Sequence, residues 1–131
     1  MQEVHPVQVA NQPTPRELEI LKTLWDNGPS GVREVYQILA EAQDDDLAYN
    51  TVQTLLRIME DKGLVKHHVA GRAFIYTPIF SREQSVDSYV DRVFNGAASE
   101  MVATLLNNER LPAKELERIQ DLINEAKRRR A

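Results

Sequence analysis

Three helical patterns followed by a β-rich hairpin, all between residues 14 and 80, constrain the fold more than any other feature of this chain. The letters TPRE at 14–17 predict a helix start, because Thr is a good cap, Pro is tolerated in the first turn and Glu suits the positive helix end. Asn27-Gly28-Pro29 ends this helix. Its apolar face comprises Leu18, Leu21, Leu24 and Trp25.

Two further helices are expected before residue 63. Ser30 is predicted to cap the second, whose inward residues are Val32, Val35, Tyr36 and Leu39. A loop at 43–46, QDDD, separates it from the third, and one of the three aspartates is expected to cap that helix. The third helix is predicted over about 47–62 and ends at Gly63.

The pattern then changes from helical spacing to short β-rich runs. The runs LVKHHV and AFIYTPI flank Ala70-Gly71-Arg72, which predicts a hairpin with glycine in its turn. Three helices and a hairpin, in this order, are typical of a winged helix-turn-helix. The sequence therefore predicts a mainly α protein with a small hairpin: a flexible arm at 1–13, a winged-helix domain at 14–80, and a helical region at 81–131.

The region 81–131 carries apolar stripes at helical spacing that three short helices cannot bury by themselves. Pairing with the same segment of a second chain would bury them, so the region is interpreted as a dimerisation domain. The residues expected at that interface are Val86, Tyr89, Val90, Val93, Phe94, Met101, Val102, Leu105, Leu106, Leu116, Ile119, Leu122 and Ile123.

The third helix has an unusual polar face. Asn50, Gln53, Thr54 and Arg57 share it, opposite the apolar positions. Amides, hydroxyls and a guanidinium match the hydrogen-bonding groups of DNA bases in the major groove, although such a face also occurs on ordinary surfaces. Charge favours DNA: residues 47–78 carry a net +2, whereas residues 1–46 carry −6 and residues 79–131 are neutral. The hairpin would then bring Lys66 and Arg72 to the DNA backbone.

Other classes of site find little support. The chain has no cysteine, no run of about 18 apolar residues and no secretory leader, which fits a cytoplasmic protein without a membrane span. No phosphate loop, G-x-S-x-G or H-E-x-x-H motif indicates an enzyme or a cofactor. His67-His68 is a weak metal candidate, because adjacent strand residues point to opposite faces. Asp44-Asp45-Asp46 is better explained as a solvated loop than as a cation site.

The chain resembles the penicillinase-repressor-type transcriptional regulators of the BlaI/MecI/CopY family. The resemblance is carried by PTPRELEILKTLWDNGP, VREVYQIL, YNTVQTLLRIMEDKGLVKHHVAGRAFIYTPI and SVDSYVDRVFNGAASEMVATLL. It implies a winged helix that binds a palindromic operator, and C-terminal helices that form a homodimer. The family's base-reading helix falls on about 48–62 here and the wing on about 64–78. The residues expected to contact DNA are Asn50, Thr51, Gln53, Thr54, Arg57, Lys62, Lys66 and Arg72.

Three departures from the family pattern are informative. Members often carry a basic residue where Asn50 stands, so base preference and phosphate affinity are expected to differ. The absence of cysteine excludes the copper-sensing branch with its cysteine-rich hook. The penicillinase branch is induced by a protease that cuts in the second C-terminal helix, often at an Asn–aromatic bond. The matching bond is Thr104–Leu105, which lacks both features and argues against cleavage-driven induction.

Two alternative functions stay open from the sequence. One is a winged-helix module that binds protein instead of DNA. The other is a phenolic-acid-type regulator that holds a small ligand between its C-terminal helices. DNA binding by the isolated protein would argue against the first, and a pocket in the dimer region would favour the second.

Overall fold

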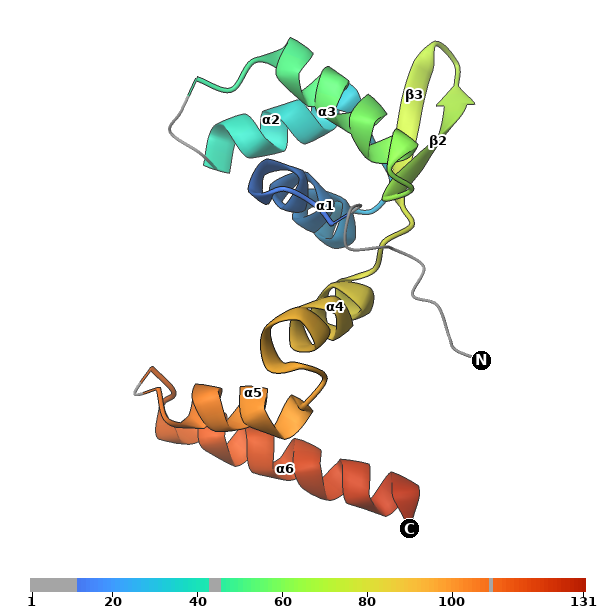
Figure 1. Ribbon diagram of the computed structural model, residues 1–131. Helices are drawn as coiled ribbons and strands as arrows, with labels where there is room; N and C mark the ends of the chain where they lie inside the picture. The colour runs from blue at the N-terminus through green and yellow to red at the C-terminus, as the bar shows by residue number, and fades with distance from the viewer. Residues whose placement is uncertain (1–11, 43–45, 109) are drawn as a thin grey trace. The chain divides into compact units, whose positions relative to one another are not determined.

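The computed structural model describes residues 12–42, 46–108 and 110–131. Most of the arm expected at 1–13 and part of the loop expected at 43–46 lie outside this range. Inter-residue contacts divide the described residues into two units, one ending at Ser85 and the other beginning at Val86. The first unit contains three helices and a three-stranded antiparallel sheet, and the second contains only helical elements (Figure 1).

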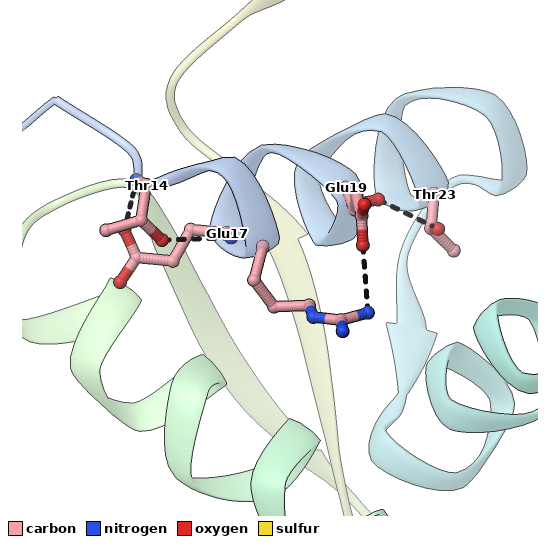
Figure 2. Close-up of polar contacts among 5 residues, drawn as sticks. Thr14, Glu17, Glu19 and Thr23 are labelled. Atoms are coloured by element: carbon pink, nitrogen blue, oxygen red, sulfur yellow. Dashed lines mark hydrogen bonds and ion pairs between the residues drawn. The ribbon is translucent and has the colours of Figure 1, made fainter. Parts of the chain in front are cut away.

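The first helix, α1 (Pro15–Asn27), begins as the sequence predicts. The Thr14 hydroxyl accepts a hydrogen bond from the Glu17 N–H, and the Glu17 carboxylate accepts one from the Thr14 N–H, forming a capping box. Figure 2 shows these two contacts, and further along the helix the contacts of Glu19. Gly28, at φ 86°, ends the helix in a conformation that side chains rarely adopt.

The residue expected to cap the second helix has a different role. Ser30 lies in a two-residue strand, β1 (Ser30–Gly31), that precedes α2 (Val32–Ala42). The Ser30 hydroxyl donates a hydrogen bond to the Gly28 carbonyl oxygen and accepts one from the Asn27 side-chain amide. In the sheet, Ser30 is paired with Tyr76 of β3. The predicted cap was therefore wrong, because a long-range strand pairing engages this segment instead.

The third helix, α3 (Tyr49–Asp61), also lacks its predicted cap. Its N-cap is Ala48, which has no hydroxyl or carboxylate to bond the first turn, so the expectation of an aspartate cap was wrong. The helix starts later than expected, and Asp46 is left two positions before the N-cap. At the other end Gly63, at φ 83°, turns the chain into the hairpin.

The hairpin consists of β2 (Val65–Ala70) and β3 (Ala73–Pro78), joined by Gly71-Arg72. The strands pair in register from Val65 with Pro78 to Ala70 with Ala73, and β1 adds to the other edge of β3. Gly71 has φ 65°, which glycine adopts readily at the first central position of a two-residue turn. Figure 1 shows this wing beside α3. The third strand, β1, was not foreseen from the sequence.

One apolar core holds the first unit together. The helices and the sheet all contribute to it, and Trp25 adds a hydrogen bond from its indole N–H to the Phe80 carbonyl oxygen. The buried cluster comprises Ile20, Leu21, Leu24, Val35, Leu39, Val52, Leu56, Met59, Leu64, Val65, Tyr76 and Phe80. Burial of this set fixes the apolar side of α3 and leaves its polar side exposed.

The second unit contains most of α4 (Arg82–Phe94), with α5 (Ala98–Leu106) and α6 (Ala113–Arg130). The break expected at Asn95-Gly96 is present, since both residues have positive φ, and Pro112 precedes α6 as predicted. Among the described residues of α5 and α6 none is buried. None of the described helices is long and apolar enough to cross a membrane.

Candidate nucleic-acid interface

The polar face of α3 is open to solvent. Asn50, Thr51, Thr54 and Arg57 are exposed, and Gln53 is half-buried. On the opposite side of the helix Val52, Leu56 and Met59 are fully buried in the core. The helix therefore presents donors and acceptors outward on a rigid, packed element, which is the arrangement that a base-reading helix requires.

A groove of about 480 Å³ lies between the start of α2, the α3 face and the wing. Three of the residues expected to contact DNA line it: Gln53 and Arg57 from α3, and Arg72 from the turn of the wing. The complete lining is Gly31, Val32, Arg33, Glu34, Tyr49, Gln53, Arg57, Arg72, Ala73, Phe74 and Tyr76. The fold thus brings residues that are separated in sequence to one basic surface.

Arg33 and Tyr49 also line this groove, although neither was expected there from the sequence. The Arg33 guanidinium lies over the Tyr49 ring, with 4.7 Å between its central carbon and the ring centroid. Arg33 belongs to residues 1–46, whose net charge is −6, so the charge distribution along the sequence does not indicate that it lies in a basic groove. Its proximity to Arg57 and Arg72 is a consequence of the fold alone.

The expected lysines differ in their surroundings. Lys66, on β2, is exposed. The Lys62 ammonium lies 2.8 Å from a carboxylate oxygen of Glu17, whose side chain is only 2% exposed. Because a buried carboxylate needs a partner, this ion pair gives Lys62 a role in joining α1 to the end of α3.

The two histidines of the wing lie in different environments. The His67 Nδ1 lies 2.7 Å and 2.9 Å from the two carboxylate oxygens of Glu60, and the His67 ring stacks on Phe74. His68 is exposed. Within the described ranges no group of three potential ligands gathers as a metal site would require. His67 therefore links the wing to α3.

Tyr76 is a buried residue that also lines the groove, and its ring centroid lies 5.7 Å from that of His67. Burial raises the pKa of its phenol above the usual 10.0, the Glu60 carboxylate raises it further, and Arg57 opposes the rise. The phenol is therefore neutral at physiological pH and adds no charge to the groove.

The apolar side chains expected at a dimer interface are mostly exposed in the single chain. In α4, Val86, Tyr89 and Val93 are exposed, Phe94 is half-buried, and Val90 is the one buried side chain of that helix. In α5 and α6 only Met101 and Ile119 of the expected set are half-buried. The exposed members are Val102, Leu105, Leu106, Leu116, Leu122 and Ile123.

Comparisons with known proteins identify relatives of this chain. A sequence model of the family described as "Penicillinase repressor" matches residues 13–125. The "Penicillinase repressor" of Bacillus licheniformis is 30% identical over 118 residues, which cover 87% of this chain and 91% of that protein. The "Transcriptional regulator BlaI" of Mycobacterium tuberculosis (strain ATCC 25618 / H37Rv) is 35% identical over 71 residues, 53% of this chain and 50% of that protein.

Among solved structures, the solution structure of the DNA binding domain of the repressor BlaI is 27% identical to this chain. It matches with a TM-score of 0.46 and covers 64% of this chain and 93% of that one. The family assignment rests on the sequence comparisons, which extend over most of the chain and into both units. The chain therefore belongs to the penicillinase repressor family, a family of transcriptional repressors and not of enzymes.

Proposed function

We propose that this repressor binds a palindromic DNA operator as a homodimer, with α3 in the major groove and the wing against the DNA backbone. The observation that carries the proposal is the exposed polar face of α3 bordered by the basic groove. Gln53, Asn50 and Thr54 offer amides and hydroxyls suited to base edges, and Arg57 offers a guanidinium at the next turn. Thr51 extends the same surface.

The backbone contacts are assigned to cations beside the reading face. Arg72 at the turn of the wing and Lys66 on β2 are exposed and lie on the element that would follow the phosphates. Lys62 was expected to join them, and its ion pair with Glu17 makes it the weakest candidate of the three. The net charge of −4 does not oppose DNA binding, because the acidic residues lie mainly outside residues 47–78.

The homodimer is proposed from the exposed stripes of α4, α5 and α6. Thirteen apolar side chains were expected at the interface, and one of them, Val90, is buried in the single chain. Large apolar side chains exposed at helical spacing on three helices are the feature expected of a surface that another protein covers. A two-fold dimer would bury the stripes and present two α3 helices to the two halves of a palindrome.

Induction by proteolysis is not part of the proposal. The Thr104–Leu105 bond lies inside α5, where the Thr104 hydroxyl donates to the Glu100 carbonyl oxygen one turn earlier. A protease would have to unwind this helix to reach the bond, and neither residue is the asparagine or the aromatic residue that the family's cleavage site often carries.

An operator-binding protein of this kind acts in the bacterial cytoplasm, where the DNA is.

The test is a mobility shift with the DNA upstream of the protein's own gene, at about 0.1 M salt, against a scrambled duplex of equal length. Tighter binding to the upstream duplex by a species of twice the monomer mass is the expected result. Equal binding to both duplexes would contradict the proposal that the upstream duplex contains an operator for this protein. Failure to bind either duplex would favour the protein-interaction module, and DNA binding released by a small phenolic acid would favour the ligand-responsive alternative.

A further inference from the structure

The arginines of the first unit fall into two sets. Arg16 and Arg82 each form an ion pair with a carboxylate on α1. Arg33, Arg57 and Arg72 come from α2, α3 and the wing, and all three line the same groove. In the described part of the chain, none of these three makes an ion pair with an acidic side chain. The three arginines that have no carboxylate partner among the described residues of this unit therefore all line the same groove.

Such a convergence of positive charge raises the energy of the folded chain unless an anion compensates it. The acidic residue in the lining is Glu34, and its carboxylate accepts a hydrogen bond from the Asn27 amide, 2.9 Å away. The groove is therefore prepared for an anion from outside the protein. Gln53 in the same lining makes the groove continuous with the expected base-reading face.

Two tyrosines fix the orientation of Arg33. The Arg33 guanidinium stacks on the Tyr49 ring at 4.7 Å, and the Tyr49 ring packs edge-to-face on Tyr36 with 5.8 Å between centroids. Stacking on a ring face restrains the plane of a guanidinium and leaves its N–H groups at the edge able to donate. Arg33 is also the second residue of α2, so the partial positive charge of a helix start adds to its own.

We propose that this groove binds a phosphate of the DNA backbone and that Arg33, oriented by Tyr49, is one of its ligands. The inference rests on the proposed function and adds Arg33 to the expected DNA contacts. Arg33 projects from α2 and not from the reading face of α3, so it contacts the backbone and carries no base preference. Tyr49 is a positioning residue, because it acts through Arg33.

The test compares Arg33→Ala with Lys22→Ala on a random duplex and on the upstream duplex, at several salt concentrations. Lys22 lies on α1 and lines a separate pocket, so Lys22→Ala removes one positive charge and leaves the groove unchanged. Arg33→Ala is expected to weaken binding to both duplexes by a similar factor, at least about tenfold, and to reduce the log–log salt slope by about one per protomer. Lys22→Ala should leave both affinities within about twofold of the parent.

The role of Tyr49 is tested by a double-mutant cycle. Tyr49→Phe keeps the ring and should bind like the parent, whereas Tyr49→Leu removes the ring face and should weaken binding. In the Arg33→Ala background, Tyr49→Leu should have no further effect, because the side chain that it orients is already absent. Circular dichroism checks that each variant is folded, and Arg33→Ala alone still decides the proposal if Tyr49→Leu fails that check.

The possible failures are distinguishable. If the parent protein binds neither duplex, the proposed function and this inference both fail. If the parent binds and Arg33→Ala behaves like Lys22→Ala, the phosphate site is wrong and the proposed function stands. Loss on the upstream duplex alone would make Arg33 a base reader and overturn the phosphate assignment. Equal effects of Tyr49→Leu with and without Arg33 would overturn the positioning role.

Discussion

The first unit buries its apolar side chains within one chain, whereas the second leaves most of its own exposed. In the first, residues from the helices and the sheet form a closed core, and three arginines line the groove beside α3. In the second, α5 and α6 carry apolar stripes with no buried residue among those described. The first unit therefore buries its apolar residues as a complete domain does, whereas the second leaves exposed the apolar residues that a partner would cover.

The largest effect is expected from placing the same charge in the two units. Val52→Asp buries an unpaired carboxylate in the closed core and should cost at least about 4 kcal/mol, enough to unfold the first unit. Val102→Asp places the carboxylate on an exposed position of α5 and should leave the first unit folded. Thermal unfolding followed by circular dichroism measures both. Equal melting temperatures would show that the difference in burial does not govern stability.

The second prediction concerns the interface itself. Leu105→Glu puts a charge on the exposed apolar stripe of α5 and should weaken dimerisation by about 2–4 kcal/mol. Val93→Glu should do the same from α4, where Val93 is exposed. Sedimentation in dilute solution should give twice the monomer mass for the parent and the monomer mass for the variants, with weaker operator binding. A parent that is monomeric and still binds the operator would contradict the proposed dimer interface.

The third prediction separates two kinds of contact within the first unit. Gln53→Ala should cost about 1–3 kcal/mol per half-site on the operator and little on random DNA, because a base-edge hydrogen bond distinguishes the two. Arg72→Ala should weaken both by similar factors and lower the salt slope, since a phosphate contact carries no sequence information. Titrations on operator and scrambled duplex measure these differences. If Gln53→Ala binds the operator with the affinity of the parent, Gln53 does not contact a base edge.

The sequence predicted best what depends on neighbouring residues. The Thr14 cap of α1, the apolar side of α3 and the turn at Gly71 each depend on a few consecutive side chains, and all three are present. The cap assigned to Ser30 failed because Tyr76, 46 positions later, pairs with that segment. Arg33 was missed for the same reason: its neighbours in the groove come from other elements.

The Glu17–Lys62 pair shows this limit most clearly, and it supports the smallest prediction. Lys62 was expected among the residues that contact DNA. In the structure its ammonium neutralises a carboxylate that is 45 positions away and almost fully buried. That carboxylate also closes the capping box of α1, so the pair joins the start of α1 to the end of α3.

Lys62→Met should therefore destabilise the first unit by about 1–3 kcal/mol, because it leaves the Glu17 carboxylate without its cation. Glu17→Gln in the same chain should recover part of the loss, since a neutral amide still accepts the Thr14 N–H. The mass of the dimer should not change, because neither residue belongs to α4, α5 or α6. Chemical unfolding measures the free energy of unfolding of the parent, of each single variant and of the double variant. DNA titration at several salt concentrations then tests whether Lys62 also contacts a phosphate. A salt slope equal to that of the parent assigns Lys62 to the fold, whereas a fall of about one per protomer, like that expected for Arg72→Ala, returns it to the phosphate contacts.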